Sequence, residues 1–230
     1  MKKITIHSEV VYLISLIVLS FSVAMLTAAD FGISMIVAPA YILSQKLTFL
    51  TFGQSEYVIQ GILFIIFCVF MKKFRPLYLV AFLTCLIYGA FLDIWRIIIP
   101  AFNPAITPVG SMDLHIRIIY FIVGIMLTCI SIALCFRTYI YPQVYDFFVQ
   151  GLSTRYNIKL TKFKVVFDLS FFALSLVLSL ALFRDFVGIN WGTIVMTITN
   201  GYTIGFFGYL IDKVFVIKPL FKKAHDLFVK

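Results

Sequence analysis

A few polar side chains inside long hydrophobic stretches are the candidates for chemistry in this sequence. Glu56 and Gln60 are four residues apart, which places them on one face of a helix. Asp168 lies in a later apolar stretch and Asn200 about midway along the last one. Burying such groups is costly unless they have partners. A carboxylate in this setting is typical of a site for a cation or a proton, and an amide of a contact to another helix or to a ligand.

Each candidate also has a structural interpretation. Lys164 precedes Asp168 by four residues, a spacing that favours a simple ion pair near one end of a helix. Asn200 is followed by Gly201 and Gly205, and this GxxxG pattern is more often a helix-packing face than a binding site. Both interpretations stay open for both positions.

Further polar residues lie near the ends of the apolar stretches. Tyr145 and Asp146 follow Pro142, which predicts a short helix with an acid near its start that complements the helix dipole or lines a gate. Asp93 and Arg96 are three residues apart, so the sequence predicts a mutual pair that closes one end of a helix.

The sequence carries no signature of an enzyme, a metal site or a cofactor. GxSxG, HExxH and Walker patterns are all missing from it. The four cysteines lie inside apolar stretches without a CxxC spacing, and the three histidines have no partner at helical spacing. We therefore expect no catalytic residue, no metal and no cofactor.

The composition predicts an all-α polytopic membrane protein. Hydrophobic residues make up 62% of the 230, charged residues 13%, and the mean hydropathy is +1.06. Six stretches are long enough, or nearly so, to cross a bilayer: Val10–Ala29, Ser55–Met71, Pro76–Ile99, Ile118–Phe136, Lys164–Phe183 and Asn190–Ile211. The first could instead be a cleaved signal peptide, but its apolar part exceeds the usual length of about 7 to 15 residues.

The distribution of lysine and arginine predicts the orientation. They gather before the first stretch, between the second and third, between the fourth and fifth, and after the sixth. By the positive-inside rule, both termini then lie in the cytoplasm of a cell-membrane protein, and residues 214–230 form a basic cytoplasmic tail. The same rule explains the net charge of +9 without nucleic acid, which we do not expect as a partner.

The chain also shows an internal repeat. Ser22–Leu47 aligns without a gap on Ser131–Tyr156, and each copy closes on a Gly-x-x-x-Asp motif, at Gly89–Asp93 and Gly208–Asp212. Chance likeness between apolar helices is the alternative. Three stretches per copy place the copies in the membrane with opposite topologies, so residues 10–99 and 116–213 would form an inverted repeat within one transmembrane domain.

Each copy contains an apolar segment too short to span a bilayer, with a proline in it. These inserts are Asp30–Ser44, which contains Pro39, and Tyr139–Ser153, which contains Pro142. They either dip back into the membrane from opposite faces or lie flat on them as interfacial helices.

Several strings resemble a known group of membrane proteins. "FGISMIVAPAYILS", "FGQSEYVIQ", "YPQVYDFFVQGLS", "KVVFD", "GINWGTIV" and "TNGYTIG" are similar to the YczE/YyaS/YitT-like family of small bacterial membrane proteins, over about residues 10–213. The resemblance implies this architecture and suggests transport or export, without an agreed substrate.

The expected function is therefore a small-solute transporter or exporter that works by alternating access. Gln60, Asp168 and Asn200 are the predicted site-lining residues, and Glu56, Tyr145 and Asp146 the predicted gate residues. One alternative is a substrate-binding subunit of a multi-component uptake system, which Ala24–Ala28 could dock to a partner membrane subunit. Another is a structural or regulatory membrane protein. The expected partners are the lipid bilayer and an unknown small solute, and the candidates for assembly are a second copy of the chain or a partner membrane subunit.

Overall fold

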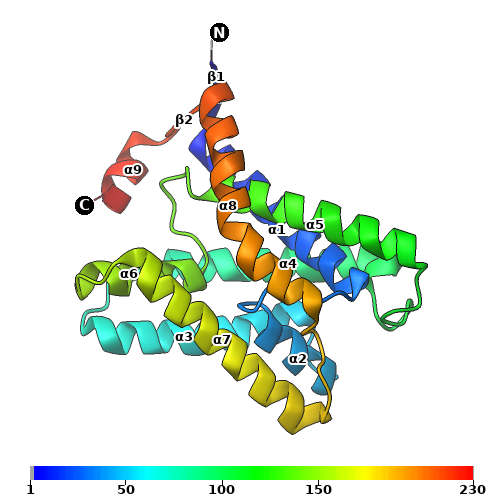
Figure 1. Cartoon of the computed structure of the whole chain (residues 1–230). Helices are drawn as coiled ribbons and strands as arrows, with labels where there is room; N and C mark the ends of the chain where they lie inside the picture. Colours follow the sequence, from blue (N-terminus) through cyan, green and yellow to red (C-terminus); the bar gives the residue numbers. More distant parts are fainter. Residues whose placement is uncertain (1–2, 230) are drawn as a thin grey trace.

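The computed structural model describes residues 3–229 as a helical bundle with two short strands (Figure 1). Six of its helices are long and apolar enough to cross a membrane, which supports a multi-pass membrane protein. These helices are α1 (Ser8–Ala29), α3 (Phe52–Met71), α4 (Leu79–Ile98, entered through the 3-10 turn Pro76–Tyr78), α5 (Leu114–Cys135), α7 (Leu160–Phe183) and α8 (Trp191–Val214). Two shorter helices, α2 (Ala38–Lys46) and α6 (Val144–Arg155), form within the inserts, and the 3-10 turn Pro100–Phe102 follows α4.

Side-chain caps determine where two of the long helices begin. The Thr51 hydroxyl accepts from the Gln54 backbone N–H, and the Gln54 side chain accepts from the Thr51 N–H. This capping box starts α3 at Phe52, three residues before the predicted Ser55, because the cap satisfies backbone groups that hydropathy does not detect. Asn190 caps α8 in the same way.

Helices α1 and α5 share the most extensive contact of any two helices in the described structure. The Ser131 hydroxyl donates to the Ser15 carbonyl at 2.6 Å, and Ser22 and Thr128 share a hydrogen bond of 2.9 Å. Small residues allow this approach, since a Cβ on Gly124 would lie 2.8 Å from Leu26.

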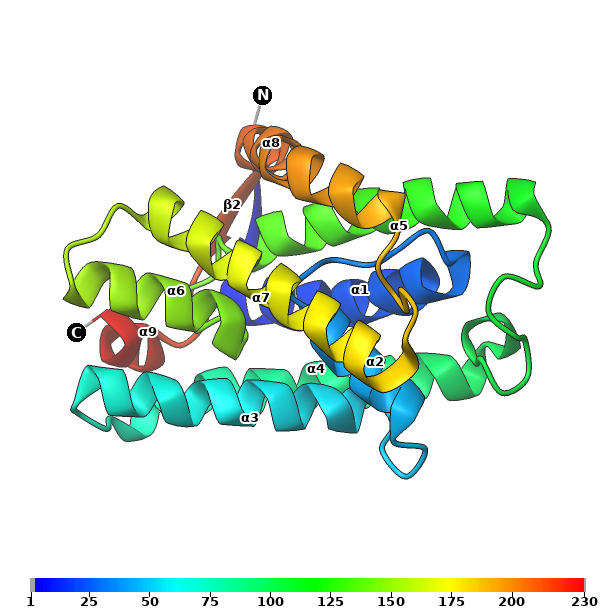
Figure 2. The same cartoon turned by 60° about the horizontal axis from the view of Figure 1, so that its bottom comes forward.

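Helices α3 and α4 lie side by side along their length (Figure 2). Their backbones meet at Gly53 and Gly89, where a Cβ on Gly53 would fall 2.1 Å from the Gly89 carbonyl oxygen. No larger residue fits at Gly53 without moving the helices apart.

Helices α7 and α8 are arranged differently. They are joined by residues 184–190 and then diverge, with no extended contact between them (Figure 1). A Cβ on Gly201 or Gly205 would meet no atom within 4 Å. The predicted GxxxG face therefore packs against nothing in the described part of the chain.

The two inserts are buried in the bundle. Helix α2 contacts α3 and α7, and α6 contacts α3, α4 and α7. Ala38–Ile42 are all buried, and so are Val144, Tyr145 and Phe147–Val149. Such burial on several sides is not expected of a helix that lies on a membrane surface.

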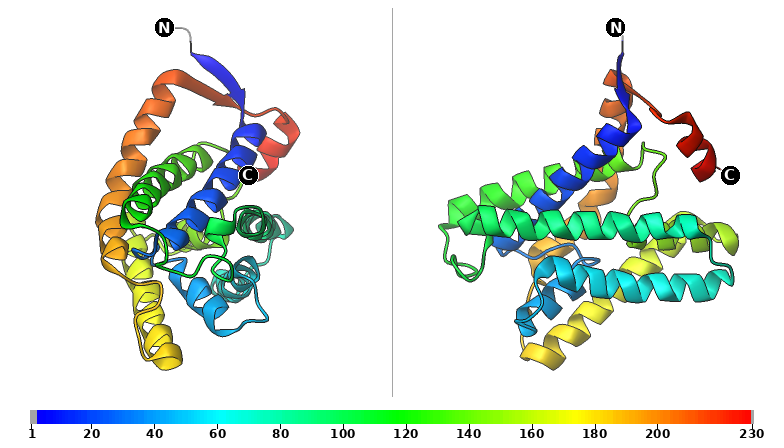
Figure 3. Two further views of the ribbon diagram at one scale, coloured as in Figure 1. Left: turned by 90° about the vertical axis from the view of Figure 1, so that its right-hand side faces the viewer. Right: turned by 180° about the vertical axis from the view of Figure 1, so that it is seen from behind.

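The two ends of the chain meet on one side of the molecule (Figure 3). Strand β1 (Ile4–His7) pairs in parallel with β2 (Phe215–Lys218), and helix α9 (Lys222–Val229) follows. Residues 215–229 are thus more than the basic surface tail that the sequence predicts, and the strands add to the predicted all-helical fold. Orientation toward the cytoplasm stays a prediction.

Candidate functional site

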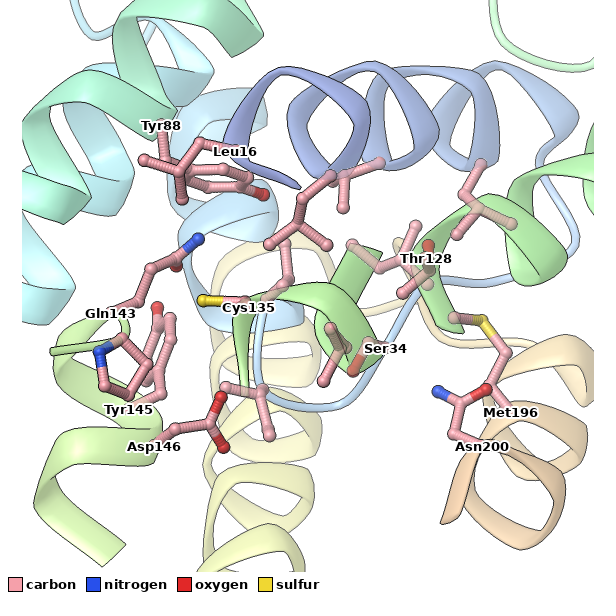
Figure 4. Close-up of a pocket in the computed structure, with 18 of the residues that line it drawn as sticks. Leu16, Ser34, Tyr88, Thr128, Cys135, Gln143, Tyr145, Asp146, Met196 and Asn200 are labelled. Atoms are coloured by element: carbon pink, nitrogen blue, oxygen red, sulfur yellow. The ribbon is translucent and has the colours of Figure 1, made fainter. Parts of the chain in front are cut away.

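A cavity of about 100 Å³ lies where the two inserts come together. Residues 33–37 of the first insert and 142–146 of the second both line it, together with side chains of α1, α4, α5 and α8. Figure 4 shows Gln143, Tyr145 and Asp146 on one side of the cavity and Met196 and Asn200 on the other.

Behind one wall of the cavity lies a buried hydrogen-bond network centred on Glu56. Oε2 of its fully buried carboxylate accepts from the Tyr145 hydroxyl at 2.9 Å and from Gln60 Nε2 at 3.0 Å. Burial raises the pKa of the Tyr145 hydroxyl well above its usual range, so this phenol is a neutral donor. Glu56 Oε1 has no partner in the described structure. An acceptor left open in this way is costly unless something binds there.

Gln143 connects this network to the cavity. Gln60 Nε2 donates to Gln143 Oε1 at 3.1 Å, and Gln60 Oε1 accepts from the Val144 backbone N–H at 3.2 Å. The second bond fixes the orientation of the Gln60 amide, and the first then fixes that of Gln143. Within residues 3–229, Gln143 Nε2 is left without a hydrogen-bond partner, although Gln143 is only 9% exposed.

A second polar cluster joins α6 to α7. The Lys164 ammonium lies 3.3 Å from Asp146 Oδ1 and 3.5 Å from Asp168 Oδ1. The predicted pair of Lys164 and Asp168 is therefore present, but Asp146 shares the lysine. Asp146 lines the cavity, whereas Asp168 lies outside its lining.

Asn200 faces the cavity from α8. Its Oδ1 accepts from the Cys129 thiol at 3.7 Å, a weak contact to α5. The side chain thus lies at a helix contact and at the cavity wall at once, so neither interpretation of Asn200 excludes the other.

A layer of contacts lies near the start of the first insert. Arg117 donates to the Asp30 carboxylate at 3.0 Å and lies over the Phe31 ring. The Gly192 N–H donates to the Phe31 carbonyl at 2.7 Å, and the Phe31 and Trp191 rings are 5.0 Å apart. Burial raises the pKa of the Asp30 carboxyl above its usual value, and the Arg117 guanidinium opposes that rise. This layer joins α5, the first insert and α8.

Five of the six predicted site residues are close to the cavity or its network. Glu56, Gln60 and Tyr145 form one network, Asp146 and Asn200 line the cavity, and Asp168 reaches it only through Lys164 and Asp146. Sequence reasoning missed Gln143 and Tyr88. The position of Gln143 directly after Pro142 was a usable signal, while nothing local marks Tyr88.

Two predictions about other residues are wrong. Asp93 does not pair with Arg96, because it accepts from the Thr51 hydroxyl at 2.5 Å and the Gly53 N–H at 2.8 Å and so holds the start of α3. Arg96 donates to the Phe102 carbonyl instead. The small patch Ala24–Ala28 offers no docking surface, since Ala24 and Ala28 are buried in the core.

These features define a class, a membrane protein with six candidate spanning helices and a largely apolar cavity between its two short inserts. The chain belongs to the Family of unknown function (DUF6198), whose profile matches residues 6–209. No curated protein matches the chain, and no solved structure does.

Proposed function

We propose that this protein is a small-solute transporter or exporter that works by alternating access. One observation carries the proposal: both short inserts, far apart in the sequence, line the same cavity together with helices of both halves. In transporters built from repeats, sites lie at the repeat interface and are formed partly by discontinuous helices. The inserts then act as re-entrant segments rather than interfacial ones.

The contacts between α1 and α5 agree with an inverted repeat. The sequence alignment pairs residue 22 with residue 131, an offset of 109. With this offset, Ser15 corresponds to Gly124 and Ser131 corresponds to Ser22. A symmetric repeat that contains the contact of Ser15 with Ser131 should therefore also contain a contact of Gly124 with Ser22. A Cβ on Gly124 would lie 3.5 Å from the Ser22 carbonyl oxygen, so the second contact exists too. Antiparallel packing of α1 on α5 by itself also gives contacts seven residues apart along both helices, so this contact agrees with the repeat and does not distinguish it from chance likeness.

The two halves differ in how tightly their helices pack, and this difference supports alternating access. Helices α3 and α4 are packed tightly, but their counterparts α7 and α8 diverge (Figure 1). An inverted repeat with equal halves would open equally to both sides. Unequal packing instead favours a state open on one side, and the layer around Arg117 and Asp30 closes the other.

Cysteine accessibility tests this proposal. In a variant without native cysteines, Asn200→Cys reports on the cavity, and a membrane-impermeant maleimide is applied from either side of membrane vesicles. We expect labelling from the cytoplasmic side. Arg117→Gln should increase labelling from the outer side several-fold, because it removes the ion pair that holds the closing layer. Arg184→Gln is the matched control, as Arg184 is exposed in the loop between α7 and α8.

Two results would contradict the proposal. One is labelling of Asn200→Cys from neither side. The other is labelling from the outer side that stays at background in Arg117→Gln, although that variant is folded. Either result would favour a structural or regulatory membrane protein.

A further inference from the structure

The lining of the central cavity is apolar along most of its length. Leucine, isoleucine, valine and methionine side chains supply this surface: Leu16, Leu19, Val23, Ile132 and Met196 among them. An apolar cavity of about 150 Å³ in another protein stays dry and binds benzene. At about 100 Å³, this cavity suits a small apolar body of at most about one ring.

The charge at the cavity is negative. Asp146 is the one charged residue in the cavity lining of the described structure. Its partner Lys164 is shared with Asp168, so two carboxylates face a single ammonium group. Arg137, the basic residue on the segment after α5, is held by Asp212 at 2.6 Å and does not offset this charge.

An unpartnered polar group gives a second, independent indication of a ligand. Gln143 Nε2 has no hydrogen-bond partner among the described residues, and Gln143 is 91% buried at the cavity wall. Because Gln143 Oε1 is taken by Gln60, the amide N–H groups are the part left free. They would suit an oxygen of a ligand or of a water bound with it, in the cavity that Asp146 also lines (Figure 4).

We propose that the cavity binds a small apolar organic cation, with a protonated amine at Asp146 and a hydrocarbon body along α1 and α5. The placement follows from chemistry alone, since an ammonium group is stabilised by a carboxylate in an apolar site and an anion is repelled. This inference rests on the proposed transport function for its role, but binding is measured separately from transport.

Three probes of nearly equal size test the class of ligand. Benzylamine is a cation at neutral pH, benzyl alcohol is neutral and benzoate is an anion. Titration calorimetry and thermal unfolding of the detergent-purified full chain measure their binding. We expect benzylamine to bind at least tenfold more tightly than benzyl alcohol, and benzoate to bind weakest. Equal binding of all three, or preference for benzoate, would overturn the proposal.

Variants distinguish the loss of the cation site from the loss of the folded structure. Asp146→Asn should weaken benzylamine at least tenfold and leave benzyl alcohol unchanged, and retained alcohol binding shows that the variant is folded. Asp226→Asn makes the same change on the exposed tail and should alter nothing. Leu19→Trp, which narrows the cavity without touching a carboxylate, should weaken both probes. Unchanged benzylamine binding in both Asp146→Asn and Leu19→Trp would show that the cation lies elsewhere.

The two proposals can fail separately. Benzylamine binding without side-dependent labelling of Asn200→Cys contradicts transport and leaves the cation site in place. Side-dependent labelling without benzylamine binding contradicts only the cation site.

Discussion

At the residue scale, Glu56 is the most constrained polar group of the molecule. Its carboxylate is fully buried, and two donors converge on one of its oxygens. Buried polar networks rigidify a core when every member is satisfied and destabilise it when one member is removed. Glu56 therefore has a structural role in addition to any role at the cavity.

Substitution of Glu56 separates these roles. Glu56→Ala leaves two buried donors, the Tyr145 hydroxyl and the Gln60 amide, without their acceptor. Each of them should lower the free energy of unfolding by about 1–3 kcal/mol. Glu56→Gln keeps an oxygen for both donors and should cost about 1 kcal/mol or less. Denaturant unfolding of the detergent-solubilised protein measures both. Equal losses in the two variants would mean that the charge, and not the hydrogen bonds, stabilises the network.

Sequence reasoning found the polar residues of the site but not how they are grouped. A carboxylate or an amide in an apolar stretch can be recognised from the sequence alone, because burying such a group is costly. Its partner is visible only when it lies three or four residues away, as with Glu56 and Gln60. Gln143 is 83 residues from Gln60, and no local pattern predicts that distance. The same limit explains the error at Asp93, whose partners lie on the neighbouring helix.

At the element scale, the tight packing of α3 on α4 holds one half of the molecule together. Gly53→Ala should destabilise the protein by about 1–3 kcal/mol, because its Cβ would fall 2.1 Å from a backbone oxygen of α4. Gly61→Ala on the same helix is the control. Its Cβ would make an ordinary contact of 3.6 Å with Phe82, and the alanine favours the helix by about 0.5–1 kcal/mol.

Thermal unfolding in detergent measures this pair of variants. The expected result is a lower midpoint for Gly53→Ala and an equal or higher one for Gly61→Ala. If Gly53→Ala unfolds at the parent's midpoint, α3 and α4 are not held as close as the structure has them, and the contrast with α7 and α8 loses its meaning.

Hydropathy predicted the number of long helices and their approximate positions, because a bilayer span requires about 20 apolar residues. It did not predict the ends of the helices, which depend on capping groups such as Thr51. It also gave no strand at either terminus, since Ile4–His7 and Phe215–Lys218 pair only with each other across the whole chain. Hydropathy also did not show whether the inserts are buried in the bundle or lie flat on the membrane surface. Their burial results from packing against α3 and α7, which their own sequence does not reveal.

At the scale of the whole molecule, the face that carries both termini is tied together by one carboxylate. Glu9 of α1 accepts from the Tyr139 hydroxyl at 2.6 Å and from the backbone N–H groups of Leu220 and Phe221. It thereby joins the first helix, the beginning of the second insert and the segment before α9. The opposite end of α1 is held by the layer around Arg117 and Asp30, so different groups fix the two ends of this helix.

If the protein transports by the proposed rocking motion, that motion must break the layer around Arg117 and can be stopped there. In the variant without native cysteines, Phe31→Cys and Trp191→Cys introduce thiols where the two rings lie 5.0 Å apart, and a short bifunctional thiol reagent joins them. Liposomes that contain this protein should lose benzylamine flux by at least tenfold, while benzylamine still binds from the open side, because the link spans only the closed end. Treatment of either single-cysteine variant should leave the flux intact. If the linked protein transports at the parent's rate, the solute does not pass between the first insert and α8, and the closing layer is a fixed part of the fold.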